Sequence, residues 1–172
     1  MKVIFLDFDG VLNSTETWRK RGKGLALGGP REGLTGGLRG LDPDHVGPLN
    51  QIVQESGAKI VISSSWRLDK KLDDMDKLDE LRLYLKQAGA ECDVIGMTSS
   101  GAFDPVRGIG NSSIRGYQIQ EWLNDHPEVT HFVILDDSDD MVHLLPKLVQ
   151  TNDRTGLERR HISEALHHLG VQ

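Results

Sequence analysis

The chain lacks most of the features that place a protein outside the cytoplasm. Its 172 residues include a single cysteine, Cys92, so no intrachain disulfide can form and a reducing compartment is expected. No apolar run approaches the roughly 20 residues that a membrane-spanning helix needs. Acids at positions 7 and 9 interrupt the first apolar segment, which argues against a signal peptide. We therefore expect a cytoplasmic protein with no membrane partner.

Positive charge and aromatic side chains are also scarce. The chain has 20 basic and 26 acidic side chains, a net charge of -6, and 5% aromatic residues. This balance argues against a surface coated for nucleic acid, although a local basic patch can still bind it. A basic, glycine-rich loop is predicted at about residues 14–41. It would either track a nucleic-acid backbone or be a solvated loop.

Short β-branched stretches alternate with amphipathic helical patterns, without an internal repeat. Strands are predicted at residues 3–6, 59–62, 93–95, 132–135 and 148–150. Helices are predicted at about 43–56, 68–88, 114–123, 139–145 and 158–169, with a second loop at 98–113. This alternation predicts one α/β domain, residues 1–172, with a mostly parallel five-stranded sheet covered on both faces. In such sheets, functional sites form at the carboxyl ends of strands.

The first predicted strand ends on two carboxylates and a glycine. Asp7 and Asp9 are two residues apart, so an extended chain points them the same way where the strand ends. Two such charges repel, and a cation or a tuned protonation state must accommodate them. Gly10 permits a sharp turn that brings backbone N–H groups near a bound anion. The pattern suits metal-assisted phosphoryl chemistry.

Polar side chains also follow two other predicted strands. Three serines follow the second strand: Ser63, Ser64 and Ser65. Four acids follow the strand at 132–135: Asp136, Asp137, Asp139 and Asp140. Arg115 begins a predicted helix upstream of these acids. An anionic nucleophile that attacks an anionic phosphate needs local positive charge, which one divalent ion and one guanidinium would provide.

These motifs, in this order, resemble those of the haloacid dehalogenase-like (HAD) superfamily of phosphatases over nearly the whole chain. The most specific stretches are Phe-Leu-Asp-Phe-Asp-Gly-Val-Leu-Asn, Ile-Ser-Ser-Ser-Trp-Arg, Gly-Tyr-Gln-Ile-Gln-Glu-Trp-Leu, Ile-Leu-Asp-Asp and Gly-Leu at 156–157. They are similar to the small phosphatase domains of RNA-repair proteins. A more distant similarity is to the phosphatase half of polynucleotide kinase-phosphatases. The resemblance implies a three-layer, Rossmann-like fold.

The resemblance also implies a role for each matching position. Asp7 would be the nucleophile, and Asp9 would protonate the leaving oxygen and then activate water. Ser63 would hydrogen-bond a phosphoryl oxygen, and Arg115 would neutralise developing charge. The implied cofactor is Mg²⁺, with ligands from Asp7, the carbonyl of Asp9, Asp136 and Asp137. Candidates for phosphate binding are the backbone of Phe8 and Gly10, together with Ser64 and Arg67.

Ordinary structural roles compete with several of these assignments. Ser64 or Ser65 is expected to cap the next helix, which leaves Ser63 as the preferred phosphate-binding hydroxyl. Asp139 or Asp140 could replace Asp137 as the second metal acid, or could lie in the first turn of a helix. Trp66 is expected to pack in the core. Lysine is the commoner residue at the position of Arg115, although a guanidinium can serve there.

The segments where HAD enzymes carry a cap domain are short in this chain. Neither residues 13–58 nor residues 68–114 leave room for a large cap, so a minimal cap and an open site are expected. An open site admits bulky phosphoesters, which favours a phosphate at an RNA or DNA end, at either the 3′ or the 5′ position. A mononucleotide or another small phosphoester is the alternative substrate. A non-catalytic domain that binds nucleic acid or a partner is the alternative of another class.

Overall fold

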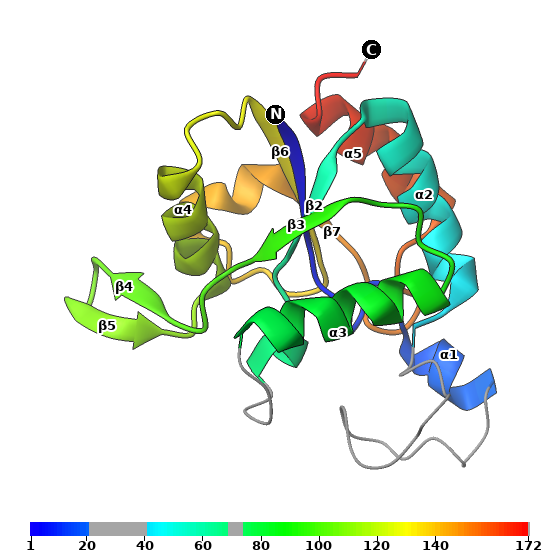
Figure 1. Cartoon of the computed structure of the whole chain (residues 1–172), viewed down its shortest axis with the longest axis horizontal. Coiled ribbons are helices and arrows are strands. Elements are labelled where there is room, and N and C mark those ends of the chain that lie inside the picture. Colours follow the sequence, from blue (N-terminus) through cyan, green and yellow to red (C-terminus); the bar gives the residue numbers. More distant parts are fainter. Residues whose placement is uncertain (21–40, 69–73, 172) are drawn as a thin grey trace.

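A five-stranded, all-parallel sheet forms the centre of the protein (Figure 1). The computed structural model describes residues 1–20, 41–68 and 74–171, apart from the side chains of residues 18, 20, 74 and 75. The strand order is β3-β2-β1-β6-β7. The strands are β1 (Lys2–Leu6), β2 (Lys59–Ile62), β3 (Val94–Met97), β6 (His131–Asp136) and β7 (Leu148–Gln150). The predicted α/β fold and its five strands are therefore confirmed.

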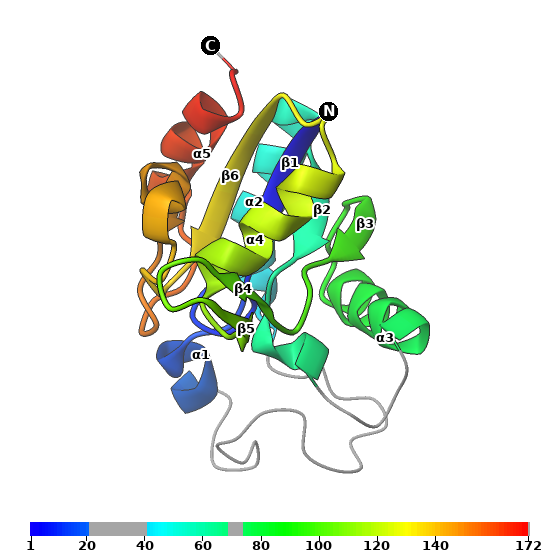
Figure 2. The ribbon, with the colours of Figure 1, turned by 90° about the vertical axis from the view of Figure 1, so that its left-hand side faces the viewer.

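Helices cover both faces of this sheet, as predicted (Figure 2). One face packs against α2 (Pro43–Ser56), α3 (Asp74–Gln87) and α5 (Ile162–His168). The other face packs against α4 (Arg115–Asp125) and the 3₁₀ helix η2 (Val142–Lys147). Ile4 and Leu6 belong to the first core, whereas Val3 and Phe5 belong to the second. Burial on both faces explains why the strands read as continuous apolar runs in the sequence.

Local signals set the ends of α2 as the sequence predicted. The side chain of Asp42 accepts a hydrogen bond from the Asp44 N–H at 3.0 Å, and Pro43 starts the helix. Gly57 ends α2 in the left-handed conformation, with φ of 67°. The predicted last helix is divided into the 3₁₀ helix η3 (Arg159–His161) and α5.

Three predicted segments differ from the structure. Residues 98–113 were expected to form a loop, but β4 (Ala102–Asp104) and β5 (Ile109–Ser112) pair there as an antiparallel hairpin. The side chain of Asp104 closes the turn by accepting from the backbone N–H groups of Val106 and Arg107. A helix, α1 (Thr15–Lys20), begins the predicted basic loop, whose residues 21–40 lie outside the described residues.

The helix expected at 139–145 is the third difference. The structure has η2 instead, which starts after both acids and contains Pro146. Asp140 precedes η2 because it is engaged by the start of α4, as described below. Asp139 and Asp140 are therefore not first-turn acids of a helix.

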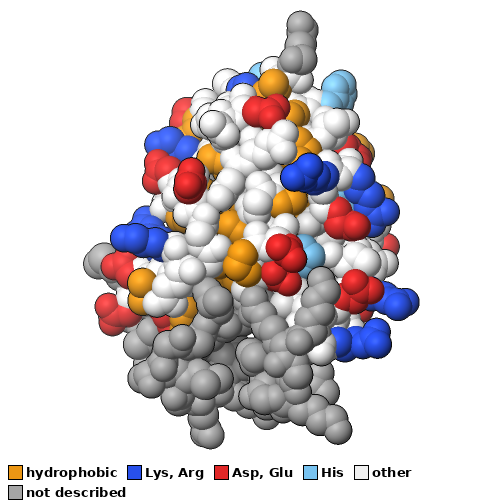
Figure 3. Space-filling view, turned by 90° about the vertical axis from the view of Figure 1, so that its right-hand side faces the viewer, with side chains coloured by type: hydrophobic (Ala, Val, Ile, Leu, Met, Phe, Trp, Pro, Cys, Tyr) orange, Lys and Arg blue, Asp and Glu red, His pale blue; other side chains and the backbone are white. Residues whose placement is uncertain are grey.

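The surface shows no dominance of either charge on the face drawn in Figure 3. Acidic and basic side chains are interspersed there, above the grey atoms. This mixture fits the small net charge of -6. Among the described residues, no helix is long and apolar enough to cross a membrane.

Candidate active site

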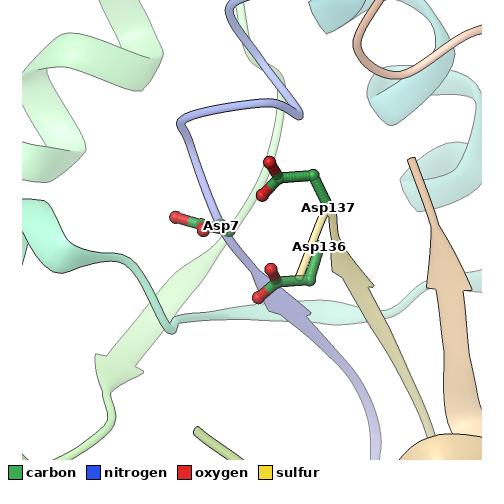
Figure 4. A group of neighbouring side chains, drawn as sticks. All are labelled: Asp7, Asp136 and Asp137. Carbon is green, nitrogen blue, oxygen red and sulfur yellow. The ribbon is translucent and has the colours of Figure 1, made fainter. Parts of the chain in front are cut away.

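Three carboxylates converge at the carboxyl ends of the two neighbouring strands β1 and β6 (Figure 4). Leu6 and Leu135 are in register, and the Asp7 N–H donates to the Leu135 carbonyl at 3.0 Å. The register therefore places Asp7 beside Asp136. One carboxylate oxygen from each of Asp7, Asp136 and Asp137 lies within 4.8 Å of the others. Asp7 and Asp136 are buried, and Asp137 is half-buried.

Arg115 bridges two of these carboxylates. Its Nη1 donates to Oδ2 of both Asp7 and Asp136. The guanidinium is held there by the start of α4, because the Arg115 N–H donates to Oδ2 of Asp140 at 3.0 Å. The next residue, Gly116, donates its N–H to the Asp140 carbonyl at 3.1 Å. Asp140 thus fixes the helix that carries Arg115.

Gly116 permits this close approach of α4 to the segment after β6. A Cβ at Gly116 would lie 2.3 Å from the carbonyl oxygen of Met141, which no side chain could tolerate without a backbone shift. Gly10 has a similar role on the other side of the site. Its φ is +72°, and a Cβ there would lie 2.4 Å from Cγ of Asp137. Both glycines allow neighbouring segments to reach the carboxylates.

The electrostatics of the cluster favour a bound cation. Burial and then the nearby Asp7 carboxylate raise the pKa of Asp136 to about 7, against the opposing effect of Arg115. Burial and Asp7 also raise the pKa of Asp137. Burial opposes the charge of Arg115, but the Asp7 and Asp136 carboxylates outweigh it and raise the pKa of Arg115 above its ordinary value. Even with Arg115 in place, burial and mutual repulsion therefore disfavour the charged forms of Asp136 and Asp137, and a bound cation would offset both effects.

The donor set fits Mg²⁺, which prefers oxygen ligands and is usually held by a few carboxylates. Three carboxylate oxygens at this spacing are of the right type, and none of them belongs to Asp139 or Asp140. Of the alternatives considered for the second acid, Asp137 is the one in the cluster. The Asp9 side chain does not belong to the cluster, and a contribution of the Asp9 carbonyl to the metal site stays a prediction.

The Asp9 carboxylate is exposed, and both of its oxygens accept hydrogen bonds. Asn13 Nδ2 donates to Oδ1 at 2.7 Å, and Trp66 Nε1 donates to Oδ2 at 2.8 Å. Asn13 Oδ1 in turn accepts from the Gly10 N–H at 3.1 Å. The Phe8 N–H donates to Oδ1 of Asp7 at 2.7 Å. The two backbone groups expected to bind phosphate, at Phe8 and Gly10, are thus both engaged by side chains.

Ser63 and Ser64 are both buried but differ in their contacts. Ser63 Oγ has no hydrogen-bond partner among the described residues. The Ser63 N–H donates to the Leu6 carbonyl, at the end of β1, at 2.9 Å. Ser64 Oγ accepts from the Trp66 N–H at 3.4 Å, at the start of the 3₁₀ helix η1 (Ser65–Leu68). A buried hydroxyl without a partner costs about 1–3 kcal/mol. A ligand oxygen that reaches Ser63 would remove this cost.

Thr98 is a further buried hydroxyl that the sequence reasoning missed. It follows β3 as Ser63 follows β2, its N–H donates to the Ile62 carbonyl at 2.9 Å, and its Oγ1 lacks a partner among the described residues. The strand here was predicted to end at residue 95, whereas β3 extends to Met97, so Thr98 fell within the predicted loop and not at a strand end.

Arg67, a candidate for phosphate binding, is engaged elsewhere. Its guanidinium donates to the carbonyls of Ser64 and Ser99 and to Oε1 of Gln118. Gln118 lies on α4 and donates to the Ser100 and Ser112 carbonyls, both at 3.3 Å. Burial, and then the nearby Arg115, lower the pKa of Arg67 to about 10, which leaves it charged at neutral pH. Arg67 therefore connects the segment after β2 to α4 directly and, through Gln118, to the hairpin.

This all-parallel sheet, with acids at the carboxyl ends of its central strands, defines a Rossmann-like α/β domain of the HAD type. The chain belongs to the family described as the HAD domain in Swiss Army Knife RNA repair proteins, whose model matches residues 3–162. A search of curated proteins gives no match. Membership confirms the family resemblance read from the motifs, and it supports a phosphatase of the HAD type.

Proposed function

We propose that the chain is a Mg²⁺-dependent phosphomonoesterase that works through an aspartyl-phosphate and acts on a terminal phosphate of RNA or DNA. The observation that carries this proposal is the convergence of three carboxylates and one guanidinium, from Asp7, Asp136, Asp137 and Arg115. Phosphoryl transfer to a carboxylate needs an anionic nucleophile and positive charge beside it to neutralise the phosphoryl oxygens.

Asp7 and Asp9 divide the covalent chemistry between them. An oxygen of Asp7 attacks phosphorus while the bond to the leaving oxygen breaks, and the carboxylic acid of Asp9 gives its proton to that oxygen. In the second step, the Asp9 carboxylate takes a proton from water. The water oxygen attacks phosphorus, which releases inorganic phosphate and restores the Asp7 carboxylate.

The other residues stabilise charge on the phosphoryl group. Arg115, held beside Asp7, neutralises the developing charge on phosphoryl oxygens, and the unpartnered Oγ of Ser63 donates to one of them. Mg²⁺, held by Asp7, Asp136 and Asp137, with the Asp9 carbonyl as a further ligand, would supply the positive charge that lets two anions approach each other. Arg67 contributes by fixing the loop that carries Ser63 and Ser64.

Family membership supports a nucleic-acid end as substrate. The matching family is a domain of RNA repair proteins. A polar hollow of about 650 Å³ lies beside Asp137 and extends past the end of β7 to the start of α5. We further propose that residues 1–172 form one domain, in which α1 and the β4–β5 hairpin lie in the two segments of the sequence where HAD enzymes carry a cap.

Replacement of the nucleophile tests this proposal most directly. We expect Asp7→Asn to lower turnover by at least about a thousandfold without loss of the fold, because the amide cannot form the acyl-phosphate. The assay would compare 3′- and 5′-phosphorylated oligonucleotides, mononucleotides and a chromogenic aryl phosphate, each with Mg²⁺ and with a chelator. Circular dichroism would verify folding. Wild-type protein that hydrolyses none of these esters, or an active Asp7→Asn variant, would contradict the mechanism.

A further inference from the structure

Trp66 places a hydrogen-bond donor on the side chain proposed as general acid. Its indole is buried, with 4% of the residue exposed, and lies edge-on to Phe8 and Tyr84 at centroid distances of 5.3 and 6.0 Å. These ring contacts leave the indole little freedom to turn. Its Nε1 donates to Oδ2 of Asp9 at 2.8 Å. A rigid, buried group therefore holds one oxygen of an exposed carboxyl group.

Asn13 holds the other oxygen of Asp9 in the same way. Its side chain is 1% exposed, and its Nδ2 donates to Oδ1 of Asp9 at 2.7 Å. Two fixed donors on two oxygens define the plane of the carboxyl group. Each carboxylate oxygen has a second lone pair, so either can still carry a proton or accept one from water. Asp9 is thus oriented without losing its capacity for proton transfer.

We propose that Trp66 is a positioning residue that aims the Asp9 carboxyl group at the leaving oxygen. This inference rests on the proposed function. The indole N–H is a donor only, so it fixes the orientation of one oxygen of Asp9. A catalytic group that is already held in its reactive orientation raises the rate of the chemical step.

Leaving-group dependence separates this role from simple packing. A nucleoside oxygen is a poor leaving group and needs the proton from Asp9, whereas 4-nitrophenolate leaves readily without it. In Trp66→Phe, we expect kcat for a phosphorylated oligonucleotide to fall by about tenfold or more. We expect kcat for 4-nitrophenyl phosphate to stay within about twofold, because that ester depends little on general-acid catalysis.

Matched variants distinguish the N–H from the ring. Tyr84→Leu removes one ring contact of Trp66 but keeps the N–H and the contact with Phe8, so we expect a smaller selective loss on the oligonucleotide than in Trp66→Phe. In an Asp9→Asn background, Trp66→Phe should cause no further loss on the oligonucleotide, because the two residues act as a unit. If Trp66→Phe does not fold, the benzothienyl analogue of tryptophan at position 66 replaces the N–H with sulfur and preserves the ring shape.

The outcomes separate this inference from the proposed function. A wild-type protein inactive on both esters contradicts the phosphatase itself. An active wild type, in which loss of the indole N–H lowers kcat equally for both esters or leaves both unchanged, overturns the role of Trp66 alone. Selective loss on the oligonucleotide that is larger in Trp66→Phe than in Tyr84→Leu supports it.

Discussion

At the scale of single residues, Arg115 is the main compensation for two buried acids in the metal-free protein. Its Nη1 contacts both Asp7 and Asp136, whose side chains are 6% and 0% exposed. Without the guanidinium, the two carboxylates would face each other with hydrogen bonds from the Phe8 and Ser138 N–H groups and with the nearby charge of Arg67. A buried charge that loses its partner usually costs about 3–5 kcal/mol.

We therefore expect Arg115→Met to lower the free energy of unfolding by about that amount in the absence of Mg²⁺. Saturating Mg²⁺ should recover part of the loss, because a bound cation compensates the same carboxylates, whereas phosphatase activity should stay low. Urea unfolding with and without Mg²⁺ measures this. Arg154→Met is the control, since Arg154 is exposed and pairs with Glu16 at 3.4 Å. Equal stability losses in the two variants would contradict the bridging role.

The sequence was sufficient to predict that acids from two strand ends lie together, but not the contacts that orient the side chains of the candidate site. Asp7 and Asp136 could be placed together because each directly follows an apolar strand, and parallel strands end at one edge. The hydrogen bond from Trp66 Nε1 to the Asp9 carboxylate could not be predicted, because it depends on the direction that η1 takes after β2. For the same reason, the hydrogen bonds of Arg67 to the Ser64 carbonyl and to Gln118 could not be predicted, and phosphate binding by Arg67 stays a prediction.

At the scale of elements, the strands and long helices were predictable and the hairpin was not. The central strands β1 and β2 are buried on both faces and are rich in valine and isoleucine, so they stand out as apolar runs. The β4–β5 hairpin has no such run, and Gly108, Gly110 and the neighbouring serines suggest a loop. Its strands are fixed instead by tertiary contacts with α4, through Gln118 and the carbonyls of Ser100 and Ser112.

The packing of α4 against the segment after β6 gives a prediction at this scale. A Cβ at Gly116 would lie 2.3 Å from the Met141 carbonyl oxygen, so Gly116→Ala must shift the start of α4 and with it Arg115. We expect a loss of about 1–3 kcal/mol in the free energy of unfolding and a fall in phosphatase activity.

Gly110→Ala is the matched control for this substitution. A Cβ at Gly110 meets nothing within 4 Å, and its backbone is not in the left-handed region. We expect its stability to change by no more than about 0.5 kcal/mol. Thermal unfolding and the aryl phosphate assay would compare the two variants. If Gly116→Ala changes neither the stability nor the activity more than Gly110→Ala does, the position of α4 does not depend on this close approach.

At the scale of the whole molecule, the parallel topology gathers the site from across the chain. Asp7 follows β1, Ser63 follows β2 and Asp136 ends β6, so neighbouring strands deliver all three to one edge of the sheet. Arg115 reaches the same edge from the start of α4. The core beneath is continuous with this edge. Charge at the site therefore contributes to the stability of the whole fold.

This coupling predicts how pH and Mg²⁺ act together on stability. The pKa of Asp136 is about 7 in the folded protein, above its ordinary value of 3.8, so the folded state binds more protons between these values. Hence the contribution of Asp136 to the free energy of unfolding falls as pH rises from about 4 to about 7. Mg²⁺ binds the deprotonated carboxylates and opposes this loss. We expect Mg²⁺ to raise Tm more at pH 8 than at pH 5.5, in scanning calorimetry at constant ionic strength. Asp136→Asn should lose most of the Mg²⁺-dependent rise, and a rise in Tm that is equal at both pH values would show that Mg²⁺ acts elsewhere.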